Sequence, residues 1–355
     1  MADPRLAVLI VDDSATVRAV LRRLVAAAPD LCVVGEAADG ARAVEAAARL
    51  EPDVILMDVE MPVMDGFHAT ERIMAARATP IVVITCRANH DEVRTAFEAI
   101  RCGAVEVLAK PEEPEGWDGL ARTLPGVIRS AAQARPPGHP ARRTQGAGEP
   151  AGAAAATLAV GWAPEVRYVA VGASTGGPSA LRDFLAALPA APPAAILVVQ
   201  HIADGFAQGL AEWLAHDLRR NVGIAGDGEA AEAGKVRLAP SGAHLLLEAG
   251  GVVRLDTGRP ARGAHRPSID ELFESCAECC PRLTAGVLLT GMGADGAAGL
   301  GALRRAGGLT MVQDEASSVV FGMPRVALET GAATIALAPA ALGGLLTTIW
   351  GGGRP

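Results

Sequence analysis

The chain has 355 residues, which is long enough for two folded domains. Half of its residues are hydrophobic and its net charge is −8. This balance excludes a disordered chain and argues against a general nucleic-acid or anionic-membrane binder. We find no apolar stretch long enough to span a bilayer and no signal-peptide pattern at the N-terminus. We therefore expect a cytoplasmic protein without a membrane-inserted segment.

Residues 1–125 alternate short apolar runs with helical patterns. The apolar runs are Leu6–Val11, Leu31–Gly35, Val54–Met57, Pro80–Ile84 and Val105–Leu108. Uninterrupted apolar strands that alternate with helices predict a parallel sheet covered on both faces. Five strands in a domain of this length predict a flavodoxin-like, doubly wound α/β fold.

The rest of the chain is predicted to hold a linker and a second domain. Residues 126–165 are rich in Pro, Gly and Ala and lack apolar periodicity, which is typical of a linker. Residues 166–350 again alternate apolar strands with helical patterns and predict a second doubly wound, mostly parallel α/β domain. Within it, HLLLEAGGVVRLD predicts an antiparallel hairpin, because two apolar runs flank Gly-Gly.

Polar residues stand at four strand ends of the first domain. Asp12 and Asp13 follow the first strand, Asp58 follows the third, Thr85 ends the fourth and Lys110 follows the fifth. Because ligands of open α/β sheets bind at the carboxyl ends of strands, we expect these side chains to share one site. Three carboxylates repel one another unless a hard cation such as Mg²⁺ joins them. The pattern therefore predicts a magnesium-dependent site in which Asp58 accepts a phosphoryl group.

The segments VDDS, LMDVEMPVMDG, VVIT and LAKP resemble the receiver domain of two-component response regulators. The resemblance implies Asp58 as the phosphoacceptor, supplied by a histidine kinase, with Asp12 and Asp13 organising Mg²⁺. It also implies Thr85 as the hydroxyl that closes on the phosphoryl group and Lys110 as its pairing cation.

Three residues of the second domain suggest nucleophilic catalysis. Ser174 lies in a G-x-S-x-G turn between a strand and a helix, where helix N–H groups favour developing negative charge. His201 ends the apolar run AAILVVQH, and Asp295 follows the strand in GVLLTGMGADG. A serine nucleophile, a histidine base and an orienting acid at one sheet edge would form a catalytic triad.

A rival interpretation uses the same glycine-rich loop. Gly291, Gly293 and Gly296 satisfy G-x-G-x-x-G between a strand and a helix, and Asp314 stands where a ribose-binding acid is expected. This pattern would indicate a dinucleotide site. However, the fingerprint normally opens a dinucleotide domain, whereas here it lies near the end of the chain, and it leaves the serine and histidine without a role.

Six further segments, in chain order, resemble the catalytic domain of bacterial chemotaxis protein-glutamate methylesterases: GASTGGP, QHIADGF, LAPSGAHLLL, HRPSIDELF, LLTGMGADGAAGL and QDEASSVVFGMP. The resemblance implies Ser174 as nucleophile, His201 as general base, Asp295 as its orienting acid and the backbone N–H of Met292 in the oxyanion hole. It implies a phosphorylation-activated esterase that hydrolyses glutamate methyl esters on chemoreceptors, with deamidation of glutamines as a related activity. Ester hydrolysis of this kind needs no cofactor.

The chain departs from these families at two places. Val107 occupies a position where receiver domains have Phe or Tyr as a switch residue, and QHIADGF lacks the Met-Pro that usually follows the histidine. The alternative function is a response regulator whose output domain binds a partner or a dinucleotide without catalysis. The complete serine, histidine and aspartate set argues against it, and the acidic balance argues against a DNA-binding output.

Overall fold

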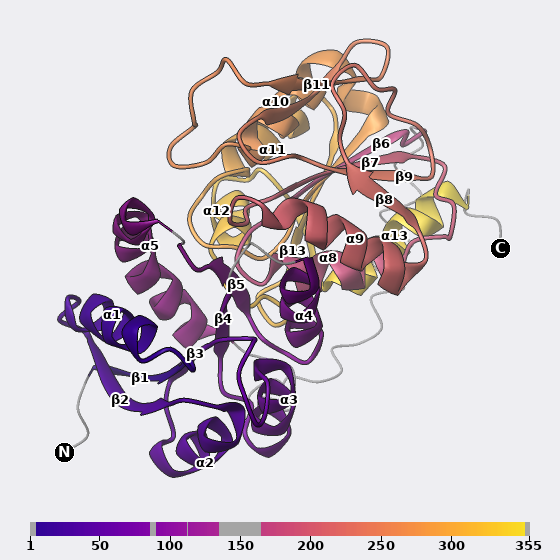
Figure 1. Cartoon of the computed structure of the whole chain (residues 1–355). Coiled ribbons are helices and arrows are strands. Elements are labelled where there is room, and N and C mark those ends of the chain that lie inside the picture. The colour runs from indigo at the N-terminus through magenta and orange to yellow at the C-terminus, as the bar shows by residue number, and fades with distance from the viewer. Residues whose placement is uncertain (1–4, 86–89, 112, 135–164, 352–355) are drawn as a thin grey trace. The chain divides into compact units, whose positions relative to one another are not determined.

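The computed structural model describes residues 5–85, 90–111, 113–134 and 165–351 (Figure 1). The chain divides into two units, residues 1–144 and 145–355, which we describe separately. Among the described helices, none combines the length and the apolar character that a membrane crossing requires.

The first unit is built on a five-stranded parallel sheet with the strand order β2-β1-β3-β4-β5. The strands are β1 (Leu6–Val11), β2 (Leu31–Ala37), β3 (Val54–Met57), β4 (Ile81–Thr85) and β5 (Glu106–Ala109). The three central strands are almost completely buried because helices cover both faces, which explains their uninterrupted apolar sequences. The predicted flavodoxin-like fold is confirmed.

Five helices cover this sheet: α1 (Ala15–Ala26), α2 (Gly40–Leu50), α3 (Gly66–Ala76), α4 (His90–Arg101) and α5 (Pro114–Gln133). Helix α1 packs with α5, whereas α2, α3 and α4 pack together on the other face (Figure 1). Helices α1, α2 and α3 begin after Ser14, Asp39 and Asp65, whose side chains accept a backbone N–H of the first turn. These caps set the point at which each strand-end loop turns into a helix.

Helix α5 extends beyond the predicted end of the first domain. Residues 126–133, which the composition assigns to the linker, form its last turns. The dipeptide Pro125-Gly126 resembles a helix break, but Leu124 and Ile128 are fully buried and hold the helix together across it. The predicted linker therefore starts inside α5, and residues 135–164 of that linker lie outside the described part of the chain.

The second unit is built on a seven-stranded sheet with the order β14-β13-β12-β6-β7-β9-β8, in which every neighbouring pair is parallel. Its strands are β6 (Tyr168–Ala173), β7 (Ala195–Gln200), β8 (Asn221–Ile224), β9 (Lys235–Leu238), β12 (Thr284–Leu288), β13 (Leu309–Gln313) and β14 (Ile335–Leu337). The predicted doubly wound fold is confirmed. The edge strands β8 and β14 are not evident from the sequence pattern, because they are short and only partly buried.

The predicted hairpin is also present. Strands β10 (His244–Glu248) and β11 (Val252–Asp256) form a separate antiparallel pair in which His244 lies opposite Asp256. Gly250 and Gly251 turn the chain with φ of 84° and 77°, a region that favours glycine.

The described helices of the second unit form two groups. They are α8 (Gly177–Ala186), α9 (Phe206–Leu218), α10 (Ile269–Cys279), α11 (Ala297–Arg305), α12 (Met323–Glu329) and α13 (Pro339–Trp350), with a short 3₁₀ turn at Pro281–Leu283. Helix α8 packs with α9 and α13, whereas α11 packs between α10 and α12 (Figure 1). Strand β6 lies between β7 and β12, so the chain winds away from it in both directions. Such a switch point leaves a crevice at the carboxyl ends of these strands.

Candidate functional site

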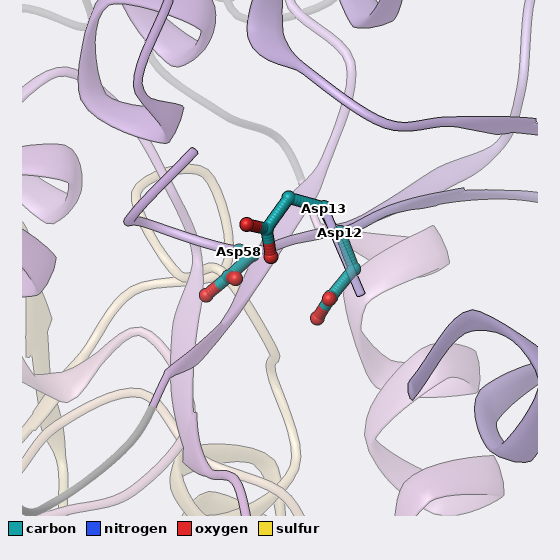
Figure 2. A group of neighbouring side chains, drawn as sticks. All are labelled: Asp12, Asp13 and Asp58. Atoms are coloured by element: carbon teal, nitrogen blue, oxygen red, sulfur yellow. The ribbon is translucent and has the colours of Figure 1, made fainter. Parts of the chain in front are cut away.

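The first unit gathers three carboxylates at the carboxyl edge of its sheet (Figure 2). Asp12 and Asp13 follow β1 and Asp58 follows β3, so adjacent parallel strands deliver them to one place. One oxygen from each lies within 4.8 Å of the others. Asp12 and Asp58 are buried, whereas Asp13 is exposed.

Lys110 brings a positive charge to two of these carboxylates. Its Nζ lies 2.8 Å from Oδ2 of Asp12 and 2.6 Å from Oδ2 of Asp58. Its backbone N–H donates to the carbonyl of the buried Thr85, which joins the ends of β4 and β5. Burial acts to lower the pKa of Lys110, but its hydrogen bonds to the two carboxylates raise it above the usual value. We therefore expect a permanently charged ammonium group.

The charges of this pocket do not balance. Burial raises the pKa of Asp58 to about 6, although the nearby Lys110 acts to lower it. Three carboxylates against one ammonium leave an excess of negative charge, and oxygen ligands at this spacing suit a small divalent cation. Asp12, Asp13 and Asp58 are thus the residues that fit Mg²⁺, as the sequence predicts.

Ser174 follows β6 at the turn into α8. Gly176 caps this helix with φ of 76°, and a Cβ on it would lie only 2.4 Å from the Cβ of Val319. The backbone N–H of Ser174 donates to the carbonyl of Thr290, which ties the end of β6 to the segment after β12. The turn therefore places Ser174 at the carboxyl edge of the sheet, at the switch point between β6, β7 and β12.

His201 lies beside Ser174 because of strand register. Ala173 pairs with Gln200 in the β6–β7 ladder, so the next residues, Ser174 and His201, stand on neighbouring strand ends about 4.8 Å apart. The backbone N–H of His201 donates to the carbonyl of Ala173. Gln200 spans both residues, since its Nε2 donates to the carbonyls of Ser174 and His201.

The His201 ring meets Asp295 through one nitrogen. Its Nε2 lies 2.9 Å from Oδ2 of Asp295, and both side chains are only 9% exposed. The other nitrogen, Nδ1, is buried and has no hydrogen-bond partner among the described residues. A neutral ring that donates from Nε2 has its lone pair on Nδ1, so Nδ1 is the atom available to accept a proton.

Four further donors surround the Asp295 carboxylate. They are the hydroxyl of Ser268 at 2.8 Å and the backbone N–H groups of Ile269 at 2.8 Å, Asp270 at 3.1 Å and Gly296 at 3.1 Å. Burial acts to raise the pKa of Asp295, but hydrogen bonds from His201, Ile269 and Ser268 hold it well below its usual range. The carboxylate is thus ionised and fixed. This support at the start of α10 is not predicted from the sequence, although Ser268 lies within the motif HRPSIDELF.

The loop after β12 packs directly against Ser174. A Cβ on Gly291 would lie 2.6 Å from the Cβ of Ser174, so only glycine fits there. Thr290 anchors the loop, because its N–H donates to Oε1 of Gln313 and its hydroxyl donates to the carbonyl of Thr175. Met292 follows and is 52% exposed. The predicted role of the Met292 N–H in an oxyanion hole stays a prediction.

The rival dinucleotide interpretation finds no support in this loop. Asp314, the predicted ribose-binding acid, accepts hydrogen bonds from the backbone N–H and the hydroxyl of Ser317 at 2.9 and 2.6 Å. Gly291 and Gly296 serve the site around Ser174 and Asp295 instead. The packing and hydrogen bonding of the site thus explain why glycine stands at these two positions without a bound nucleotide.

Comparison with known proteins agrees with the two halves of this structure. Residues 169–346 match the family model of the CheB methylesterase, and residues 8–117 match that of the response regulator receiver domain. The crystal structure of the Thermotoga maritima CheB methylesterase catalytic domain is 36% identical, with a TM-score of 0.50, over 52% of this chain and 98% of that one.

Full-length relatives share both halves. A protein of Geobacter metallireducens named protein-glutamate methylesterase/protein-glutamine glutaminase 4 is 43% identical over 345 residues, covering 96% of this chain and 98% of the relative. A protein of the same name from Myxococcus xanthus is 41% identical over 354 residues and 99% of both chains. The chain therefore belongs to the CheB methylesterase family, with a receiver domain ahead of the methylesterase domain.

Proposed function

We propose that the chain is a serine esterase that hydrolyses glutamate methyl esters on chemoreceptor proteins, controlled by phosphorylation of its receiver domain. The names of its relatives give the substrate class. The observation that carries the catalytic half is the His201–Asp295 hydrogen bond at Nε2, which leaves the buried Nδ1 of His201 to act as the base. Strand register puts His201 and Ser174 on neighbouring strand ends.

The reaction begins when the Ser174 hydroxyl attacks the ester carbonyl. A bond forms between Oγ and the carbonyl carbon while the hydroxyl proton passes to Nδ1 of His201. Asp295 stabilises the resulting imidazolium, since its carboxylate is ionised and held by the N-terminus of α10. The backbone N–H of Met292 would donate to the negative charge that develops on the carbonyl oxygen.

The leaving group then takes the proton from His201 and departs as methanol. Water attacks the acyl-enzyme with the help of the same base, and glutamate is released from Ser174. An amide would follow the same course and lose ammonia, which accounts for deamidation of glutamines as the second activity in the relatives' names. We expect no cofactor in this half of the molecule.

The receiver domain would accept its phosphoryl group on Asp58 from a histidine kinase. Bound Mg²⁺, held by Asp12, Asp13 and Asp58, would neutralise the charge of the incoming phosphoryl oxygens. Lys110 would pair with a phosphoryl oxygen, and the Thr85 hydroxyl would close on the group from the end of β4. Phosphorylation of Asp58 would favour one conformation of the receiver over another, and this shift would control the esterase.

Val107 bears on this control. The receiver families place an aromatic switch residue at its position, whereas the Val107 side chain is buried in β5. We expect phosphoryl transfer to proceed, because Val107 is not among the residues that hold the phosphoryl group.

We place the protein in the cytoplasm, where a histidine kinase and the inner ends of chemoreceptors meet it.

The test is methanol release from membranes that carry methylated chemoreceptors. We expect release by the full chain and a higher rate when Mg²⁺ and acetyl phosphate are added together. Asp58→Asn should lose this stimulation, whereas Ser174→Ala should lose the release itself. Methanol release that Ser174→Ala does not reduce would contradict the proposed mechanism, and stimulation that survives in Asp58→Asn would place the control elsewhere.

A further inference from the structure

The imidazole ring of His265 lies flat against that of His201. The ring centroids are 3.8 Å apart and the ring planes are 3° from parallel. His265 belongs to the loop between β11 and α10, and neither the triad nor its supporting hydrogen bonds uses it. We propose that His265 is a positioning residue that holds the plane of the catalytic His201 ring. This inference rests on the proposed function.

The stacked ring supplies a restraint that the Asp295 hydrogen bond does not. One hydrogen bond at Nε2 fixes a single edge of the His201 ring, and rotation about the bond between Cβ and the ring is otherwise soft. A parallel ring at van der Waals distance blocks this rotation, because turning His201 would drive its edge into His265. Together the two contacts leave one orientation of Nδ1, the atom that takes the Ser174 proton.

The stack also distinguishes the two histidines electrostatically. Burial lowers the pKa of His265, and the nearby His201 lowers it further, whereas Asp295 acts to raise it. When His201 takes the proton from Ser174, the neighbouring ring is therefore neutral. A neutral aromatic face attracts a cation, so the stack favours the imidazolium instead of repelling it.

The backbone holds His265 in place independently of its ring. Arg262 and His265 exchange two backbone hydrogen bonds of 3.0 and 3.1 Å. The guanidinium of Arg262 reaches α10, where its Nη2 lies 2.8 Å from Oε1 of Glu274. The N-terminus of this helix also holds Asp295. One helix thus sets both contacts of the catalytic ring.

A second histidine fastens the same loop from within the fold. His244 is fully buried, donates from Nε2 to the carbonyl of Pro260 at 3.0 Å, and accepts at Nδ1 from the N–H of Ser268 at 3.2 Å. Because these bonds do not involve the His265 side chain, we expect the loop to keep its path when His265 is replaced.

The experiment replaces His265 in the full chain with Ala, Phe or Leu. Two rates are measured: methanol release from methylated receptors, separated into kcat and KM, and labelling of Ser174 by a fluorophosphonate. In the labelling step the Oγ–P bond forms, the P–F bond breaks, fluoride leaves and the hydroxyl proton passes to His201. Labelling needs no methyl ester, so it measures activation of Ser174 alone.

We expect His265→Ala to lower kcat and the labelling rate about tenfold to a hundredfold, with KM changed less than about threefold, because the base is misaligned. His265→Phe should recover most of both rates, since it restores a flat ring, and His265→Leu should recover less. His216→Ala, which removes a histidine of α9 that the site does not use, should change neither rate.

The inference is overturned if His265→Ala keeps both rates within twofold of the native chain. It is also overturned if His265→Phe is as slow as His265→Ala, or if only KM changes, since these results indicate loop stability or substrate contact. A native chain that is labelled at Ser174 but releases no methanol would overturn the proposed substrate instead. The comparison of labelling rates among the His265 variants would still decide the role of His265.

Discussion

The two candidate sites of this chain occupy the same position in two doubly wound sheets and treat charge in opposite ways. In the receiver, Asp12, Asp13 and Asp58 lie together, the Lys110 ammonium contacts only Asp12 and Asp58, and burial raises the pKa of Asp58 to about 6. In the methylesterase domain, Asp295 alone receives five hydrogen bonds, and its pKa is held well below the usual range.

The difference shows that the position of a carboxylate at a strand end does not determine its charge state. Both sheets deliver polar side chains to their carboxyl edge, but the number of donors around each carboxylate decides its charge state. A pocket with excess negative charge suits a cation and a phosphoryl group. A carboxylate whose oxygens already accept several hydrogen bonds stays ionised and fixed, so it can orient a histidine. The following predictions test this contrast, beginning with the variants whose rate should fall most and ending with the stability of the receiver.

The largest effect is expected from the nucleophile. Ser174→Ala should lower methanol release by about 10⁴-fold or more, since the acyl-enzyme cannot form. Uptake of phosphate from acetyl phosphate by the receiver should stay normal, because it depends on the other sheet. A variant that keeps more than a tenth of the native rate would show that another group is the nucleophile.

Asp295→Asn should come next, with a loss of kcat of about 10³–10⁴-fold. The substitution keeps the size of the side chain but removes the charge that stabilises the imidazolium. It also sets an amide NH₂ group against donors that now point at a carboxylate oxygen. The measurement is kcat for methanol release alongside a thermal unfolding curve. Equal loss of kcat and of folded protein would indicate a structural role only.

Ser268→Ala should have a smaller effect, because it removes one of several hydrogen bonds to Asp295. We expect kcat to fall about fivefold to twentyfold, which corresponds to roughly 1–2 kcal/mol. Ser268 precedes α10, but its hydroxyl donates to Asp295 and does not cap the helix. Ser275→Ala, inside α10, is the matched control. Its hydroxyl bonds Leu247 and Leu272, so stability should change and kcat should not.

The last prediction concerns a stability instead of a rate, namely that of the receiver without Mg²⁺. The pKa of Asp58 is higher in the folded state than its ordinary 3.8, so the folded receiver binds this proton more tightly than the unfolded one. Stability is therefore lost as the pH rises from about 4 to about 6. Asp58→Asn removes this penalty and should stabilise the receiver by about 1–3 kcal/mol at pH 7.5.

Hydrogen exchange measured on peptides from β1 and β3 checks this prediction domain by domain. The difference between Asp58→Asn and the native chain should shrink as the pH falls toward 4. A difference that stays constant with pH would mean that burial of the Asp58 charge does not cause it. Addition of Mg²⁺ should stabilise the native chain more than the variant, because the variant lacks one of the three carboxylates.

Much of this molecule was determined by local sequence. The strands β1 and β3 were predicted residue for residue, because buried parallel strands need uninterrupted apolar runs that turn residues bound on each side. The same pattern placed Asp12, Asp58, Ser174 and His201 at strand ends. Both fold classes follow from this alternation of strand and helix.

Other features were decided only by tertiary structure. Ser268 reaches Asp295 across 27 residues of sequence, and His265 stacks on His201 from a different loop. The hydrophobic periodicity of the sequence does not predict such contacts, because they depend on how α10 packs against the sheet. Helix α5 continues through Pro125 for a similar reason, since burial of Leu124 and Ile128 outweighs a local break signal. Local sequence thus set the strands and the residues at their ends, whereas packing between distant segments set the partners that fix their charge and orientation.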